Sequence, residues 1–239
     1  MRKVTRAMIM AAGFGTRMRP LTDHIPKPLV TVRGKSLLDH TLDRLVAAGV
    51  TMVVINLHYR GAQVQDHLAK RRDIEIRYSL EEEILGTGGG VVKALPHFEG
   101  ESFFVLNSDS VWVEGYVSPL TAMQRIWEPE RMDGLLLLAS MITAMGYEGR
   151  GDFLLDVNGR VSRVPELTSS PFAYTGVQIV HPRLFTAAPA GNFSTNRMWD
   201  LAIAKGRLFG IRLEGVWIHV GTPDAREDAE RYLARLMPA

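Results

Sequence analysis

The chain has 239 residues, of which 46% are hydrophobic and 23% charged, and it contains no cysteine. This composition excludes an intrinsically disordered chain, a collagen and a disulfide-stapled small domain. The lack of cysteine also excludes a thiolate zinc site and a cysteine nucleophile. A chain of this length buries roughly 70–75% of the surface that it exposes when unfolded. We therefore expect one domain, residues 1–239, with a sizeable core.

The positive charge is concentrated at the start of the chain. Residues 1–35 carry eight of the 28 basic residues and one of the 26 acidic residues, a local charge of +7 in a chain of net charge +2. Such a segment is typical of a nucleic-acid-binding surface, a membrane-binding surface or a site for a small polyanion. A plain solvated surface gives the same pattern, so charge alone leaves these alternatives open.

The apolar stretch after Arg6 is too short for an export signal. It runs for six residues, from Ala7 to Ala12, and ends in a glycine-containing loop. An export signal needs about 7–15 apolar residues followed by a cleavage site. No stretch approaches the roughly 20 apolar residues of a membrane span. The sequence therefore predicts a cytoplasmic protein with no membrane partner.

Short apolar runs alternate with helical patterns through the first half of the chain. Ser36 is a predicted helix N-cap, because apolar residues follow it at helical spacing as far as Val46, and Gly49 is the predicted stop. Run length and β-branched content distinguish the strands from the helices. The predicted strands are 7–12, 50–57, 74–78 and 103–106, and the predicted helices are 37–46, 61–70 and 91–95, the last after a glycine-rich turn.

The second half of the chain has a different pattern. The turn pair Asn158-Gly159 inside segment 152–164 predicts a β-hairpin. Segment 135–141 fits a strand or a buried helix, and the remaining predictions are strands within 173–180 and 208–220 and a helix over 223–236. The whole pattern predicts an α/β fold with a doubly wound, mostly parallel, Rossmann-like sheet and an added antiparallel β region.

The segment Gly13-Phe14-Gly15-Thr16-Arg17 lies where the first predicted strand ends. Its glycines let backbone N–H groups approach a ligand closely and form a concavity that binds anions. The arginine supplies a planar fork that suits phosphate oxygens. Lys27 lies between two prolines, which restrict the backbone that aims its ammonium group. The spacing matches no P-loop, and Met18 stands where a dinucleotide fingerprint has its third glycine.

Several further segments share one pattern with this loop. They are Arg19-Pro20-Leu21-Thr22, Pro26-Lys27-Pro28-Leu29, Gly86-Thr87-Gly88-Gly89, Asn107-Ser108-Asp109 and Trp217-Ile218-His219-Val220-Gly221-Thr222. Together they resemble the sugar-1-phosphate nucleotidyltransferases over nearly the whole chain. The resemblance implies transfer of a nucleotidyl group from an NTP to a sugar-1-phosphate, with release of pyrophosphate. It also implies a nucleotide-binding half, 1–130, and a half, 131–239, that holds the sugar site and the C-terminal helix.

The resemblance also implies roles for single residues. Arg17 and Lys27 would contact phosphate and Asp109 would bind Mg²⁺, or alternatively Mn²⁺, so these three are the expected catalytic residues. The expected nucleotide-binding residues are Ala11, Ala12, Gly13, Gly15, Thr16, Arg17, Lys27, Gly86, Thr87, Gly88 and Asn107. The expected sugar-binding residues are Asp152, Glu166, Thr175 and Gly176.

Three positions depart from the family pattern. His219 stands where a second metal-binding aspartate is usual, and an imidazole suits transition metals better than Mg²⁺. A one-metal enzyme, an Mn²⁺ enzyme and a catalytically impaired chain all fit; we assign His219 to the metal site beside Asp109, with a peripheral role in an active enzyme. Ser108 replaces a glycine, and Leu167 follows Glu166 where a lysine is usual.

Two segments narrow the resemblance to a subgroup of the family. Leu85 to Gly90, Gly149 to Phe153 and the short chain resemble the N-acetylmuramate-1-phosphate uridylyltransferases of bacterial cell-wall recycling, which implies UTP as the nucleotide. The alternatives are a guanylyl- or thymidylyltransferase for mannose or another hexose, and a non-catalytic sugar-nucleotide-binding protein. We expect no nucleic-acid partner, and the sequence leaves the oligomeric state open.

Overall fold

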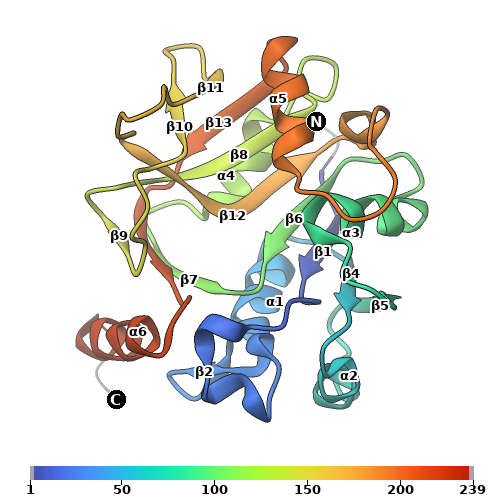
Figure 1. Cartoon of the computed structure of the whole chain (residues 1–239), viewed down its shortest axis with the longest axis vertical. Helices are drawn as coiled ribbons and strands as arrows, with labels where there is room; N and C mark the ends of the chain where they lie inside the picture. Colours follow the sequence, from blue (N-terminus) through green and yellow to red (C-terminus); the bar gives the residue numbers. More distant parts are fainter. Residues whose placement is uncertain (1–2, 237–239) are drawn as a thin grey trace.

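The structure is a computed structural model that describes residues 3–236. One nine-stranded sheet forms its centre (Figure 1). Arg2, part of the basic opening segment, lies outside the described residues. The parallel core has the order β6-β1-β4-β5, and its strands are β1 (Arg6–Met10), β4 (Met52–Leu57), β5 (Glu75–Leu80) and β6 (Phe103–Asn107). Every residue of β4 is buried, as expected of a parallel strand covered on both faces.

The sheet continues beyond β6 with mostly antiparallel pairs. The strands are β12 (Phe172–Val180), antiparallel to β6; β8 (Gly134–Ser140), antiparallel to β12; β13 (Leu208–Arg212), parallel to β8; and the hairpin β10 (Phe153–Leu155) with β11 (Val161–Arg163). The hairpin has its turn at the predicted Asn158-Gly159. The predicted fold class is confirmed, and segment 135–141 belongs to strand β8 up to Ser140.

Helices cover both faces of the sheet. Side chains of α1 (Leu37–Ala47), α2 (Gly61–Leu68) and α4 (Pro119–Ile126) share one apolar cluster with Ile9 of β1, whereas α3 (Gly86–Ala94) and α5 (Asn196–Ala204) share another with Met8. Adjacent residues of a strand point to opposite faces, so this split shows a doubly wound arrangement. The predicted cap of α1 is confirmed, because Ser36 Oγ accepts a hydrogen bond from the Asp39 N–H at 3.0 Å.

A smaller sheet joins the C-terminal segment to the end of β6. It has the order β7-β14-β9, with β7 (Ser110–Glu114), β14 (Gly215–His219) and β9 (Ala144–Met145). The helix α6 (Pro223–Leu236) packs on β14 and on the hairpin β2 (Thr31–Val32) and β3 (Lys35–Ser36) (Figure 1). The pairing of β14 with β7 sets His219 opposite Ser110, next to the start of β7.

The glycine-rich segment after β5 differs from its prediction. A turn followed by a helix over 91–95 was expected, but the helix α3 begins at Gly86 and includes all of the glycines. A Cβ at Gly88 would collide with the Phe193 ring, and one at Gly89 with the backbone of Gly191. Glycine is therefore present here because tertiary packing leaves no room for a side chain, which overrides its low helix propensity.

Some elements of the structure were not predicted from the sequence. The elements that no pattern predicted are α4, α5, β7, β9, the β2–β3 hairpin and the 3₁₀ helices Thr16–Met18, Leu21–Asp23, Lys27–Leu29, Leu95–Phe98 and Pro182–Phe185. Within residues 3–236, no helix is long and apolar enough to cross a membrane.

Candidate active site

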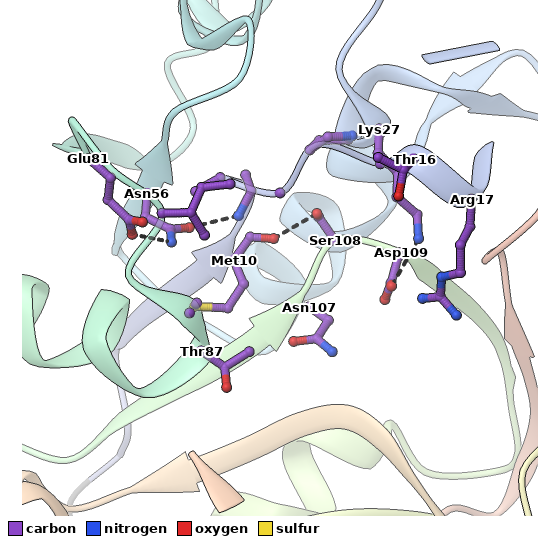
Figure 2. A pocket seen from close by; sticks show the side chains of 17 residues that line it. Met10, Thr16, Arg17, Lys27, Asn56, Glu81, Thr87, Asn107, Ser108 and Asp109 are labelled. Carbon is purple, nitrogen blue, oxygen red and sulfur yellow. Dashed lines mark hydrogen bonds and ion pairs between the residues drawn. The ribbon is translucent and has the colours of Figure 1, made fainter. Parts of the chain in front are cut away.

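A cavity of about 360 Å³ lies at the carboxyl ends of β1, β4 and β6. This edge of an open α/β sheet is where ligands bind, because loops from adjacent strands diverge there. Figure 2 shows two groups of polar side chains facing each other across it: Asn56 and Glu81 on one side, and Thr16, Arg17, Lys27 and Asp109 on the other. We call this the nucleotide cavity, after the residues expected to bind a nucleotide that line it. Ten of the eleven expected nucleotide-binding residues line it, all except Gly88.

The glycine loop is shaped for a close approach of a ligand. Gly15 has a left-handed backbone with φ of 65°, and a Cβ there would lie 3.0 Å from Lys27 Cβ, so glycine is required by the fold itself. At Gly13, by contrast, a Cβ would meet no protein atom within 4 Å. The space beside Gly13 is open to the cavity and free for a ligand. A 3₁₀ helix that begins at Thr16 then carries Arg17 to the cavity rim.

Lys27 and Asp109 form the centre of the charged side. The Nζ atom of Lys27 lies 3.1 Å from Oδ2 of Asp109, and both side chains are largely buried, at 13% and 19% exposure (Figure 2). Burial alone would raise the pKa of Asp109, but the Lys27 ammonium, aided by His219 and Arg17, holds it below its usual range. Asp109 is therefore ionised at neutral pH.

His219 lies on the other side of Asp109. Its Nδ1 is 4.0 Å from Oδ1 of Asp109, too far for a hydrogen bond. Burial lowers the pKa of His219; the Asp109 carboxylate opposes this, and Lys27 and Arg17 add to it. The imidazole is therefore neutral at pH 7. A backbone hydrogen bond holds the two segments together, because the Val220 N–H donates to the Asp109 carbonyl at 2.8 Å.

The donor set at Asp109 fits one mode of metal binding. Within the described residues 3–236, no group of three or more His, Asp or Glu side chains could hold a metal ion by itself. Asp109 Oδ1 accepts no hydrogen bond from any described residue and is left available at the cavity wall. Mg²⁺ is commonly bound by one or two carboxylates together with substrate phosphates. The residues present fit that arrangement and not an all-protein cage.

The side of the nucleotide cavity opposite Lys27 and Asp109 rests on a buried polar network. Asn56 Oδ1 accepts from the Ala11 N–H at 2.7 Å, and Asn56 Nδ2 donates to Glu81 Oε1 at 2.7 Å. Glu81 Oε2 in turn accepts from the Leu85 N–H at 3.0 Å. The pair thus fixes the backbone at Ala11 and at Leu85. Figure 2 shows the contact between Asn56 and Glu81 at this end of the cavity. A Cβ at Gly90 would lie 2.8 Å from Glu81 Oε1, so that glycine makes room for the network.

Sequence reasoning did not predict this network. An acidic run such as Glu81-Glu82-Glu83 fits a solvated edge or a flank of the base pocket, and neither interpretation contains a buried hydrogen-bond network; Glu81 is only 5% exposed while Glu82 and Glu83 are exposed. The available signal was Asn56, a polar residue in an otherwise apolar strand. A buried amide requires partners, and Glu81 supplies one of them.

Asn107-Ser108-Asp109 connects the two sides of the site. Ser108 stands where the family has a glycine, and a hydrogen bond explains the serine. Its buried hydroxyl donates from Oγ to the Met10 carbonyl at 2.7 Å and so links β1 to the end of β6 (Figure 2). Gly176 has φ of 84°, and a Cβ there would lie 2.9 Å from Asn107 Cβ. Glycine at this position therefore allows β12 to approach Asn107 closely.

Two further cavities adjoin the nucleotide cavity, and Asn107 lines all three. The aromatic cavity, about 260 Å³, lies between β10–β12 and α5 and is lined by Phe153, Tyr174 and Trp199 among others. The acidic cavity, about 550 Å³, is lined by Asp109, His219 and three further carboxylates, Glu148, Asp224 and Asp228.

The expected sugar-binding residues are distributed over these cavities. Asp152 lines the aromatic cavity, where its carboxylate accepts from the Tyr147 hydroxyl at 3.1 Å and the Tyr174 N–H at 2.7 Å. Thr175 and Gly176 line the acidic cavity, but the Thr175 hydroxyl already donates to the Leu137 carbonyl at 2.9 Å. Glu166 is exposed on a loop and lines none of the three cavities.

Comparison with known proteins gives one answer. Residues 6–133 match the nucleotidyl transferase family. The chain is 42% identical to an N-acetylmuramate alpha-1-phosphate uridylyltransferase of Caulobacter vibrioides, over 95% of this chain and 96% of that one. A Neisseria meningitidis protein of the same name is 34% identical over 94% and 96%. A Xenopus laevis mannose-1-phosphate guanyltransferase beta-B is 30% identical over 91% of this chain, which spans 61% of that longer protein.

A solved structure supports the fold alone. UDP-glucose pyrophosphorylase in complex with UDP-glucose superposes with a TM-score of 0.80 at 17% identity, covering 98% of this chain and 100% of that one. The full-length similarity to the two uridylyltransferases and the family match over the first half agree with the resemblance inferred from the motifs. The chain belongs to the nucleotidyl transferase family of enzymes.

Proposed function

We propose that the protein transfers a uridylyl group from UTP to N-acetylmuramate α-1-phosphate, giving UDP-N-acetylmuramate and pyrophosphate. Two relatives of that name match it at 42% and 34% identity across 96% of their own length, whereas it spans only 61% of the mannose-specific relative. The reaction consumes a triphosphate made in the cytoplasm, where we propose that the enzyme works.

The nucleotide cavity offers a different chemistry at each end. We place the base near Asn56 and Glu81, where fixed backbone groups can read a uracil edge, and the triphosphate at Gly13, Arg17 and Lys27. Backbone N–H groups of the glycine loop and two cations neutralise phosphate charge there. In this arrangement two of the eight basic residues of the opening segment, Arg17 and Lys27, form a local polyanion site.

The reaction requires little covalent chemistry from the protein. An oxygen of the sugar phosphate attacks the α-phosphorus of UTP in line, and the bond to the bridging oxygen of pyrophosphate breaks. The attacking monoester is already anionic at neutral pH, so no protein base or nucleophile is needed. Arg17 and Lys27 hold the two polyanions together and stabilise the charge that builds up on the phosphate oxygens.

Asp109 has a separate role in this proposal. Its free Oδ1 would hold Mg²⁺, which when bound supplies further neutralisation of phosphate charge. Its other oxygen, paired with Lys27, keeps that ammonium aimed into the cavity. His219 borders the same carboxylate and, as a neutral imidazole, has a peripheral position.

The observation that carries the proposal is the meeting of Arg17, Lys27 and Asp109 at one end of the nucleotide cavity, with Asn107 connecting that cavity to two others. Phosphorus NMR of the protein with UTP, Mg²⁺ and N-acetylmuramate 1-phosphate should show pyrophosphate and the two diphosphate signals of a UDP-sugar. The same mixture with the Asp109→Asn variant should show only the substrates. Absence of both products with the wild-type protein would refute the proposal.

A further inference from the structure

We propose that Arg163 is a specificity-determining residue that binds the carboxylate of the muramate side chain. This inference rests on the proposed function, because N-acetylmuramate differs from N-acetylglucosamine by a lactyl ether that ends in a carboxylate. An enzyme that selects the muramate sugar needs a cation where that group lies. Arg163, at the end of β11, is the one basic side chain among the described residues that line the aromatic cavity.

The aromatic cavity has the chemistry of a sugar site. Trp199 forms edge-to-face contacts with Phe153 and Tyr174, with ring centroids 5.7 and 4.8 Å apart, so the three rings form one rigid wall. Aromatic surfaces cover the apolar faces of a pyranose ring, while side chains such as Thr195 and Asn196 offer hydrogen bonds to its hydroxyl and amide groups. Asn107 connects this cavity to the charged end of the nucleotide cavity, where the sugar phosphate must react.

The other adjoining cavity suits a carboxylated sugar poorly. The acidic cavity has four carboxylates, those of Asp109, Glu148, Asp224 and Asp228, against one arginine, Arg17. A carboxylate placed there would be repelled by like charges. Asn107 lines both the aromatic and the acidic cavity. Of these two, only the aromatic cavity combines an aromatic wall suited to a sugar ring with a cation beside it.

Contacts on two sides hold the Arg163 guanidinium in place. Its carbon lies 4.8 Å from the Phe153 ring centre and 6.0 Å from that of Trp199, so the planar group lies against the aromatic wall. Its Nε donates to Asp200 Oδ1 at 2.7 Å, and its Nη2 donates to the Asn196 side chain and backbone. Nη1 donates to no described residue and is available to an incoming anion.

The charge of Arg163 is only partly compensated by the protein. Its partner Asp200 has a side chain that is 58% exposed, so water screens this ion pair and its contribution is small. The carboxylate of Asp152 is already hydrogen-bonded by Tyr147 and Tyr174. A bound sugar would exclude water from the cavity and strengthen a charge-assisted hydrogen bond to Nη1.

The test compares two products that differ only in the lactyl group. Calorimetry would measure the affinities of UDP-N-acetylmuramate, UDP-N-acetylglucosamine and UTP for the wild-type protein, for Arg163→Met and for Arg197→Met. Methionine keeps an apolar side chain against the rings, and Arg197 is an exposed arginine on the same helix as Trp199 that lines none of the three cavities. UTP reports on folding of each variant, because Arg163 does not line the nucleotide cavity.

We expect Arg163→Met to lose about 10- to 100-fold in affinity for the muramate product and to keep the affinities for UDP-N-acetylglucosamine and UTP within about threefold. Arg197→Met should match the wild type for all three ligands. A variant Arg163→Met that still selects the muramate product would overturn this inference and leave the proposed function standing. A wild-type protein without preference for the muramate product would overturn the proposed function itself.

Discussion

The ammonium of Lys27 lies 3.1 Å from the carboxylate of Asp109, although 82 residues separate them in the chain. The contact joins the segment after the glycine loop to the end of β6. It forms at the edge of the sheet where the carboxyl ends of the parallel strands β1 and β6 lie side by side. Each group also determines the other's state, because the lysine keeps the buried carboxyl ionised and the carboxylate fixes the lysine's direction.

Replacing Asp109 with Asn tests the role of the negative charge in this contact. The amide keeps the size of the side chain and can still accept from Lys27, but it removes the charge available to a cation. We expect turnover to fall at least about 100-fold, while the midpoint of thermal unfolding stays within a few degrees. Steady-state pyrophosphate release and calorimetric melting measure the two effects. The matched control is Asp73→Asn, a surface aspartate paired with Arg71, which should keep wild-type rates.

His219 should be far less important than Asp109. Its imidazole is neutral and makes no hydrogen bond to Asp109, so His219→Asn should lower turnover with Mg²⁺ by less than about tenfold. Comparing the rates in Mg²⁺ and in Mn²⁺ tests whether His219 takes part in the metal site with either ion. A loss as large as that of Asp109→Asn in either metal would show that His219 is an essential part of the metal site.

The two loop glycines should respond differently to the same change. Gly13→Ala places a methyl group in space that no protein atom occupies, so stability should be unchanged while the KM for the nucleotide rises about tenfold or more. Gly15→Ala forces a left-handed residue against Lys27 and should cost about 1–2 kcal/mol of unfolding free energy. Urea denaturation and nucleotide kinetics on both variants distinguish them. An unchanged KM in Gly13→Ala would mean that no ligand approaches this residue.

Asp133 should make part of the stability depend on pH. Its Oδ1 accepts from Arg183 Nε at 2.6 Å and Arg207 Nε at 2.8 Å, which joins the residue before β8 to the 3₁₀ helix Pro182–Phe185 and to the residue before β13. Burial would raise the pKa of Asp133, but the two arginines lower it below its ordinary value of 3.8. The lowered pKa belongs to the folded state, so the stabilisation is present above about pH 4 and is lost as the pH falls through the folded value.

The variant Asp133→Asn isolates that contribution. At pH 7 it should lower the unfolding free energy by about 2 kcal/mol, because two charge-assisted hydrogen bonds are weakened. Urea denaturation between pH 7 and pH 2.5 should show the difference from the wild type shrinking as the aspartate protonates. A difference that stays constant over this range would contradict the assignment.

Local patterns were sufficient for most of the fold and for one side of the cavity. Apolar runs and β-branched residues located the strands, Ser36 and Gly49 marked the ends of α1, and the glycine loop, Arg17 and Lys27 were chosen as anion-binding candidates that prove to line one cavity. These features depend on residues close together in sequence. They can therefore be read without the rest of the chain.

The features that escaped prediction depend on distant packing. In α3, Gly86 and Gly88 are explained by Phe193 and Gly89 by Gly191, each more than 100 residues later, and the role of Glu81 is explained by Asn56 on the neighbouring strand. The close approach of Gly176 to Asn107 needs the antiparallel pairing of β12 with β6. No local pattern contains these partners, so only the folded chain shows them.

The most direct test of the proposed activity is kcat/KM for pyrophosphate release, measured for UTP, GTP, dTTP and ATP with the 1-phosphates of N-acetylmuramate, N-acetylglucosamine, mannose and glucose. The uridylyltransfer account predicts that UTP with N-acetylmuramate 1-phosphate exceeds every other pair by at least about tenfold. A higher value for GTP with mannose 1-phosphate, or no release with any pair, would contradict it.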